Sequence, residues 1–454
     1  ARLLLAAAIL HLVLILPAHP AGVAWATLAR VPLELPLILF GLAALGRARV
    51  ALPVRVGLTA GLVGLVVLKA ADIATFLALG RAFNPVADLA LIAPAHELLS
   101  DAIGRVETAS ALAAAGLSLV AIGWAIWWAT GTFADAAPRR RAWRVPVALA
   151  AGLAGGGVIA DLADPSPLPA RIPEARSARL LAGKIATARA TFRDLRAFRA
   201  AAATDPYAGA SELLDRIDRD VILVFVESYG RTSLDTPLYA DPHRATLAAG
   251  EERLGELGLA TASGLLASPT RGGQSWLAHA SVANGLWIDG ETRYRAALAS
   301  GRKTLYHLAA EAGFRTAAVM PQITSDWPES ATMGFDTVLE AADLGYEGES
   351  FNWVTMPDQF TYAALDRRLR GPDRDRNLFV QVATGTSHAP WVPVPELVPW
   401  EAIGDGRIFN EMARSGDTPE TVWKDRDRVR AQYRRAVDYA LQAVLSYAAR
   451  QADD

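Results

Sequence analysis

Three short segments of the chain carry side chains whose types and positions suit catalysis. The first is Glu227-Ser228-Tyr229-Gly230-Arg231, which directly follows the apolar run Val221–Val226. A continuous apolar run of this kind is typical of a strand buried on both faces, so Glu227 stands where such a strand ends. Its carboxylate is a hard oxygen ligand that suits Mg²⁺, Mn²⁺ or Zn²⁺. The alternative is that Glu227 caps a helix or pairs with Arg231.

The second segment runs from Thr270 to His279 and has Ser275 at its centre. Gly272 and Gly273 allow the backbone to approach a ligand closely, so Gly273 is a candidate for substrate binding. Ser275 stands where the run Trp276–Ala283 can begin a helix, and a helix N-terminus offers N–H donors to an anion. Ser275 is therefore a candidate nucleophile toward phosphorus, provided that a metal lowers its proton affinity. The alternative is a serine that only caps the helix.

The third segment is Thr384-Gly385-Thr386-Ser387-His388-Ala389-Pro390-Trp391, which follows the apolar run Asn377–Ala383. His388 lies in a loop rich in hydroxyl groups, where it could contact a phosphoryl oxygen or protonate a leaving group. The alternative is an ordinary surface histidine. A weaker fourth candidate is Asp326-Trp327-Pro328-Glu329, in which Trp327 is a possible substrate contact.

The elements around these segments alternate between strands and helices. Strands are predicted over Val221–Val226, Arg315–Met320 and Asn377–Ala383, and helices over Lys303–Ala312, Asp358–Leu369 and Arg428–Arg450. This alternation predicts an α/β domain with a mostly parallel sheet and helices on both faces. Ligands of such sheets bind at the carboxyl ends of the strands, which is where two of the three segments begin.

The N-terminal third of the chain is much more apolar than the rest. Five stretches approach the roughly 20 apolar residues that a membrane-spanning helix needs: Leu3–Pro17, Val23–Leu45, Val56–Leu79, Ala111–Thr132 and Val145–Ala163. Two of the connections between them are rich in arginine, with Arg47, Arg49 and Arg55 in one and Arg139, Arg140, Arg141 and Arg144 in the other. The positive-inside rule places these two connections in the cytoplasm and everything after about Asp164 outside it.

The predicted organisation is therefore a transmembrane domain of five helices over residues 1–163, a juxtamembrane linker over 164–219, and an extracytoplasmic α/β domain over 220–454. Within the spans, Lys69 and Asp72 are three residues apart and are expected to pair on one helix face, while Glu34 lies between Pro32 and Pro36 near a kink. The arginine-rich helix predicted over Ala175–Ala202 either lies on anionic lipid or is a solvated connector packed against the next domain.

Composition excludes several classes of protein. The 454 residues contain no cysteine, which rules out disulfides, thiolate metal sites and a cysteine nucleophile. A formal net charge of -2 argues against a nucleic-acid-binding protein. The chain begins at Ala1 rather than at a methionine and ends inside a helical pattern, so we expect it to be a C-terminally truncated fragment.

Taken together, these segments and this layout resemble the alkaline phosphatase and sulfatase superfamily. The nearest resemblance is to membrane-anchored phosphoglycerol transferases of the lipoteichoic acid synthase type. It implies five transmembrane helices, a linker and an extracytoplasmic catalytic domain that holds one divalent metal ion, here Mn, Mg or Zn.

The resemblance also assigns roles to residues. It implies that Glu227 is a metal-binding carboxylate and that Ser275 takes the place of the family's threonine, as nucleophile and metal ligand. It implies that His388 lies near the substrate phosphate and that Trp327 belongs to a substrate loop, although Glu329 stands near the position where the family has an arginine. The family's remaining metal ligands are an adjacent Asp-His pair, which does not occur in this chain and is expected beyond residue 454.

The sulfatase branch of the superfamily oxidises a Cys or Ser in the motif C/S-x-P-x-R to formylglycine. Ser275 lies ten residues before Gly285, as that motif requires, but Leu277 replaces the proline and His279 replaces the arginine. The segment Ala267–Arg271 has the proline and the arginine but alanine at the reactive position. Neither segment is expected to form formylglycine.

The expected function is transfer of a phosphoglycerol-type headgroup from a membrane phospholipid to a glycan or other hydroxyl acceptor through a covalent Ser275 intermediate. The expected donor is phosphatidylglycerol. The expected location is the inner (cytoplasmic) membrane, as a multi-pass protein with its catalytic domain outside the cytoplasm. One alternative is a hydrolase of phosphodiesters or sulfate esters that uses the same site. The other is a membrane-bound, non-catalytic binding protein with a degenerate site.

Overall fold

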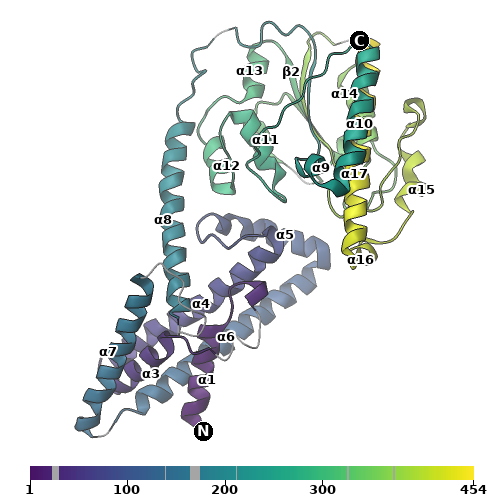
Figure 1. The fold of residues 1–454 in the computed structure, drawn as a ribbon. Coiled ribbons are helices and arrows are strands. Elements are labelled where there is room, and N and C mark those ends of the chain that lie inside the picture. Colours follow the sequence, from purple (N-terminus) through teal and green to yellow (C-terminus); the bar gives the residue numbers. More distant parts are fainter. Residues whose placement is uncertain are drawn as a thin grey trace. The chain divides into compact units, whose positions relative to one another are not determined.

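A computed structural model describes residues 1–22, 30–138, 140–163, 174–210, 212–324, 327–371 and 374–453. The chain divides into two compact units, Ala1–Ala197 and Phe198–Asp454, which are drawn in Figure 1. The first unit is helical and the second contains the sheet.

The helices of the first unit are α1 (Arg2–Ile15), α3 (Glu34–Leu45), α4 (Ala51–Leu79), α5 (Ile92–Ile103), α6 (Arg105–Asp135), α7 (Arg141–Ala163) and most of α8 (Arg176–Ala202), with short 3-10 turns η1 (Pro20–Gly22) and η2 (Asp88–Leu91). Three helices, Ala51–Leu79, Arg105–Asp135 and Trp143–Ala163, are long and apolar enough to cross a membrane, and α1 and α3 are shorter apolar helices. The predicted stretch Val23–Leu45 begins in residues 23–29, which lie outside the described ranges.

The expected pair between Lys69 and Asp72 is wrong. The ammonium group of Lys69 donates instead to the backbone oxygens of Val13 (3.1 Å) and Leu14 (2.8 Å), in the last turn of α1. A helix leaves its last carbonyls without partners inside the helix, and a cation satisfies both their hydrogen bonding and the negative end of the helix dipole. Asp72 pairs with the buried Lys184 of α8, with 2.5 Å between Oδ1 and Nζ.

Polar groups fix the start of α8 to the apolar helices of the first unit. Asp161, in the last turn of α7, accepts from the backbone N–H of Ala175 (3.0 Å) and forms an ion pair with Arg179 (2.8 Å). Glu34 accepts from the backbone N–H of Ala178 (2.9 Å), and the Ser177 hydroxyl donates to Leu14 O (3.0 Å). Each acidic group thereby satisfies an otherwise unpaired N–H near the α8 N-terminus.

The second unit is built on a parallel sheet, as predicted. Its strands are β1 (Val221–Phe225), β2 (Arg315–Met320), β3 (Thr337–Glu340) and β4 (Leu378–Ala383), in the order β1-β4-β2-β3. All three pairings are parallel. The sequence did not predict β3, because four residues with only two large aliphatic side chains give little strand signal.

Helices cover both faces of this sheet. The helices of this unit are α9 (Thr232–Asp235), α10 (Pro237–Glu256), α11 (Ser275–Asn284), α12 (Glu291–Leu298), α13 (Leu305–Glu311), α14 (Asp358–Leu369), α15 (Asn410–Ala413), α16 (Pro419–Val422) and α17 (Arg426–Arg450). Successive residues of a strand point to opposite faces. Val380 accordingly joins a core cluster with residues of α14 and α17, whereas Phe379 joins a separate cluster with residues of α11 and α13.

Candidate functional site

The loops that follow β1 and β4 are joined to one another. The backbone N–H of Thr384 donates to Phe225 O (3.0 Å), and the N–H of Glu227 donates to the Thr384 hydroxyl (3.4 Å). The Ser387 hydroxyl donates to Glu227 O. Because β1 and β4 are adjacent and parallel, their carboxyl ends meet at one edge, and the structure brings the Glu227 loop and the His388 loop together there.

Ser275 is the first residue of α11 and is not its cap. Gln274 occupies the N-cap position, and the α11 N-terminus has no side-chain capping bond. The alternative that Ser275 is an ordinary N-cap is therefore wrong. Gly273, with φ 102°, lies two residues before Ser275 in a conformation that favours glycine.

His279 connects α11 to the end of β1. Its buried ring lies 4.1 Å from the ring of Phe225, measured between centroids. Ser275 and His279 are one helical turn apart and share a face. Phe225 is two residues before Glu227, so this contact brings the serine end of α11 toward the Glu227 loop. Burial lowers the pKa of His279 to about 4, so its ring is neutral at physiological pH.

Unusual backbone conformations occur in all three loops. Ser228, Gln274 and Trp391 have φ values of 54°, 60° and 61°. Residues other than glycine occupy this left-handed region infrequently and at some energetic cost. Such residues are concentrated at functional sites, where the surrounding structure holds them. Their positions beside Glu227, Ser275 and His388 agree with a site at this edge of the sheet.

Asp358 holds the His388 loop in place, and sequence reasoning missed it. Its fully buried carboxylate accepts from the backbone N–H groups of Gly385 (2.9 Å) and Thr386 (2.8 Å) through Oδ1. Burial is the largest influence on this carboxyl and raises its pKa, although these hydrogen bonds oppose the shift. An aspartate in the first turn of a predicted helix is ordinary, so no pattern in the sequence indicates this role.

The loop after β2 also reaches this edge of the sheet. A Cβ at Gly385 would lie 2.0 Å from Nε2 of Gln322, so a side chain there would displace that glutamine. Gln322 in turn donates to the hydroxyl of Thr355 (3.3 Å). The Gln322 side chain, from the loop after β2, thus lies directly against Gly385.

An exposed group of aromatic rings borders the His388 loop. We call Trp391, Trp423 and Tyr433 the aromatic platform. The rings of Trp391 and Trp423 are stacked with centroids 5.7 Å apart, and Tyr433 meets Trp391 edge-on at 5.4 Å. Trp391 Nε1 donates to Ser387 O (2.8 Å), and the Tyr433 hydroxyl donates to Ser228 O (2.9 Å). These bonds place the platform next to both loops.

Trp327 packs elsewhere. Its ring lies 6.1 Å from that of Phe335 and joins the core cluster that contains Tyr306 and Phe314. Within the described ranges no hydrogen bond or ring contact connects Trp327 with Glu227, Ser275 or His388. Asp326 lies outside the described residues.

The residues present fit a hard divalent cation in chemical type. The carboxylate of Glu227 and the hydroxyl of Ser275 are partly exposed. Neither side chain has a hydrogen bond or ion pair with any residue that the structure describes. Carboxylate and hydroxyl oxygens suit Mg²⁺ and Mn²⁺, and Zn²⁺ also accepts them. No group of three His, Asp or Glu side chains gathers anywhere within the described ranges, so this pair supplies only part of a coordination shell.

The fold and this edge of the sheet define an α/β domain with reactive oxygen groups at the carboxyl ends of parallel strands. The sulfatase family model matches residues 219–454, which is just over half of the chain. The chain therefore belongs to the sulfatase family. No curated protein and no solved structure matched it. Family membership supports transfer or hydrolysis of phosphate or sulfate esters, and enzymes of this family generally use a divalent metal.

Proposed function

We propose that this protein is a membrane-anchored phosphoryl transferase that moves a phosphoglycerol-type headgroup from a phospholipid to a hydroxyl acceptor. The observation that carries the proposal is the position of Ser275. Its hydroxyl has no hydrogen-bond partner among the described residues. It belongs to the first residue of α11, the helix whose His279 ring contacts Phe225, two residues before Glu227. A helix N-terminus stabilises the negative charge of a bound phosphate.

In the first half of the proposed reaction, Ser275 Oγ attacks the phosphorus of the phospholipid and loses its proton. A bond forms between Oγ and phosphorus, and the bond between phosphorus and the diacylglycerol oxygen breaks. That oxygen keeps the electron pair, takes up a proton and leaves as diacylglycerol. A divalent cation held by Glu227 and Ser275 would lower the pKa of the serine hydroxyl and offset charge on the phosphoryl oxygens.

His388 is the proposed proton donor or phosphoryl contact. Its Nδ1 lies 2.6 Å from Ala389 O, which leaves Nε2 as the nitrogen that faces a ligand. In the second half of the reaction the acceptor hydroxyl attacks the phosphorus, the Oγ–phosphorus bond breaks, and the Ser275 hydroxyl is restored. Gly273 allows the backbone beside Ser275 to approach the headgroup. We also propose that Trp327 contacts the substrate, which requires its loop to move closer to Ser275 when substrate binds.

The aromatic platform supports a glycan as the acceptor. The face of an aromatic ring is electron-rich and attracts the C–H groups on the apolar face of a sugar. Trp423 is 51% exposed, so the stacked pair presents an open ring surface next to the His388 loop. A glycan stacked there would bring a hydroxyl group toward the phosphorylated Ser275.

Membrane anchoring suits a lipid donor, because the diacylglycerol product stays in the bilayer. We propose that α1, α3, α4, α6 and α7 all cross the inner membrane and that the catalytic unit lies outside the cytoplasm. Three of these helices have the length and composition for it. The second candidate is a hydrolase in which water replaces the acceptor, which the family membership supports equally.

Replacement of Ser275 by alanine tests the proposal. The full chain, loaded with Mn²⁺ and given phosphatidylglycerol labelled in its headgroup, should retain label after denaturation. Ser275→Ala should abolish this label and reduce turnover by about six orders of magnitude. Ser268→Ala, in the preceding exposed loop, should leave both unchanged. Persistent label on Ser275→Ala would exclude Ser275 as the nucleophile.

Product analysis separates the remaining possibilities. A transferase releases less free glycerol phosphate when a glycan acceptor is added and forms a phosphoglycerol-modified glycan. A hydrolase releases the same amount with or without the glycan. A non-catalytic binding protein forms neither product and no covalent label.

A further inference from the structure

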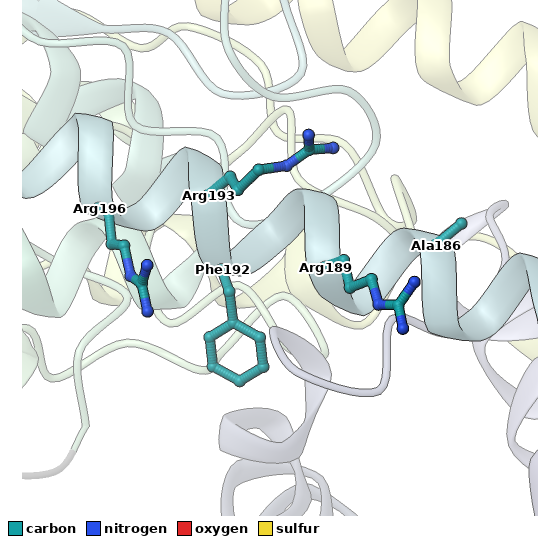
Figure 2. A pocket seen from close by; sticks show the side chains of 5 residues that line it. All are labelled: Ala186, Arg189, Phe192, Arg193 and Arg196. Carbon is teal, nitrogen blue, oxygen red and sulfur yellow. The ribbon is translucent and has the colours of Figure 1, made fainter.

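The middle of α8 carries a face of arginines that the chemistry at Ser275 does not use. We call Arg189, Phe192, Arg193 and Arg196 the basic face. Together with Ala186 they line a hollow on the surface of the helix. Figure 2 shows that Arg189, Phe192 and Arg196 extend to one side of α8 and that Arg193 extends to the other. All four are exposed, and Phe192 is 55% exposed. None of the three guanidinium groups has an ion pair or hydrogen bond among the residues that the structure describes.

The other side of the same stretch of α8 is fixed to the end of α4. Lys184 donates to Phe83 O (2.6 Å) in addition to its pair with Asp72. One heptad later, the hydroxyl of Thr191 accepts from the side chain of Asn84 (3.0 Å). Phe83 and Asn84 follow within a few residues of the end of the apolar helix α4 at Leu79. Residues 184–191 of α8 therefore lie at the level where α4 would leave the hydrocarbon layer.

Helix α5 also indicates that residues 184–191 of α8 lie at the membrane surface. It follows the Phe83–Asn84 loop and exposes Ile92, Leu99 and Ile103, with exposed fractions of 61%, 39% and 47%. These positions recur at seven- and four-residue spacing, so they lie along one face of the helix. A short helix with an exposed apolar face next to a membrane span is typical of a segment that lies in the plane of the membrane surface. The loop that binds α8 is joined directly to this segment.

We propose that the basic face binds the headgroup phosphates of anionic phospholipids at the membrane surface. The three arginines are spaced by four and three residues, so their guanidinium groups can contact neighbouring phosphates with paired hydrogen bonds. Phe192 lies between Arg189 and Arg196, and Ile185, which is 53% exposed, lies one turn before Arg189. Both apolar side chains can enter the glycerol region of the lipids. Each basic residue near an anionic surface strengthens binding about fivefold. This site is distinct from Ser275, and its existence does not depend on the proposed function.

The absence of cysteine allows a site-specific test. The Ala186→Cys variant of the full chain is labelled with an environment-sensitive fluorophore beside the basic face and placed in nanodiscs. Nanodiscs of phosphatidylcholine alone are compared with mixtures that contain increasing phosphatidylglycerol, up to equimolar. We expect a blue shift that grows with the phosphatidylglycerol fraction and weakens at high salt, because salt screens surface charge.

Charge removal on the basic face should suppress this response. With Arg189→Gln, Arg193→Gln and Arg196→Gln combined, we expect the midpoint of the phosphatidylglycerol titration to rise at least tenfold. The triple replacement of the same arginines by lysine should retain most of the response. A matched control removes three exposed arginines of the second unit, with Arg216→Gln, Arg368→Gln and Arg435→Gln, and should leave the midpoint unchanged.

Three results would overturn the proposal. One is a fluorophore that does not respond to phosphatidylglycerol, as expected if another part of the protein covers this face. Another is an equal loss of response in the matched control. The third is an equal blue shift with inorganic phosphate in phosphatidylcholine nanodiscs, which would show a site for free phosphate. Ser275→Ala should respond like the parent chain, so failure of the proposed catalysis does not affect this test.

Discussion

The carboxyl group of Asp358 couples the shape of the candidate site to pH. Its Oδ1 accepts two backbone N–H bonds from the His388 loop, while Oδ2 has no hydrogen-bond partner among the described residues. Burial raises its pKa above the ordinary value of 3.8. A raised carboxyl pKa means that the folded protein prefers the protonated group. Its contribution to stability is therefore fully present below the unfolded pKa and is lost as pH rises through the folded pKa.

We predict that Asp358→Asn reduces the fall in unfolding free energy as pH rises from about 4 toward neutrality. The amide oxygen can still accept both N–H groups, and no charge has to be buried. Asp358→Ala should instead lower the unfolding free energy by about 2–3 kcal/mol, because it leaves two buried donors without an acceptor.

Denaturant titrations of the second unit's transition at several pH values measure both effects. Asp215→Asn, at an exposed position, provides the matched control and should follow the parent protein. A parent protein and an Asp358→Asn variant with the same pH dependence would contradict the assignment of this group.

The contrast between Asp358 and the predicted site residues has a physical basis. Glu227 and His388 could be proposed from the sequence because polar residues that follow an apolar strand are unusual and have a known position. Ser275 followed from two glycines before a helix. Asp358 acts through two backbone N–H groups of a segment 27 and 28 residues away. Such pairing depends on tertiary structure and leaves no local pattern.

At the scale of the elements, the buried pair between Lys184 and Asp72 joins α8 to α4. Both side chains are almost completely buried, with exposed fractions of 10% and 3%. We predict that Lys184→Met lowers the unfolding free energy by about 3–5 kcal/mol, because an unpaired buried carboxylate remains. The double variant Lys184→Met/Asp72→Asn should recover much of this loss.

Thermal unfolding of the full chain in detergent measures this cycle. Thr187→Met, on an exposed part of the same helix, controls for the introduced side chain. Equal melting temperatures for the single and double variants would show that the two charges are not coupled. The prediction of a Lys69–Asp72 pair failed because spacing within a helix shows only that two side chains are close on one surface. It does not show which groups from other helices bind each of them in the folded protein.

The aromatic platform allows the acceptor step to be separated from the donor step. We predict that Trp423→Ala leaves the formation of the covalent Ser275 intermediate unchanged, because Trp423 has no bond to the Glu227 or Ser275 segments in the structure described. It should raise the KM for a glycan acceptor about tenfold, as expected for the loss of one stacked ring. Trp287→Ala, at another exposed tryptophan, is the control. An unchanged acceptor KM would remove the support for a glycan.

At the scale of the whole molecule, the parallel sheet and the apolar half followed from the sequence for related reasons. Long apolar runs arise either from strands buried on both faces or from helices in lipid, and length separates the two cases. The number of membrane crossings does not follow as directly. Helices α1 and α3 span about 21 Å and 18 Å at 1.5 Å per residue, with 14 and 12 residues, while the hydrocarbon core is about 30 Å thick.

Cysteine accessibility decides between five crossings and three. We predict that a membrane-impermeant maleimide labels Ala208→Cys of the second unit in intact spheroplasts, whereas it labels Ala48→Cys, between α3 and α4, only after permeabilisation. A third position, Ala21, is exposed like Ala208 and Ala48. Ala21 lies between α1 and α3, so Ala21→Cys should react from outside if both helices cross the membrane. If only α4, α6 and α7 cross, Ala21 shares the cytoplasmic side with Ala48 and both remain protected. Protection of Ala208→Cys would place the catalytic unit in the cytoplasm and rule out a glycan acceptor outside the cell membrane, whatever the chemistry at Ser275.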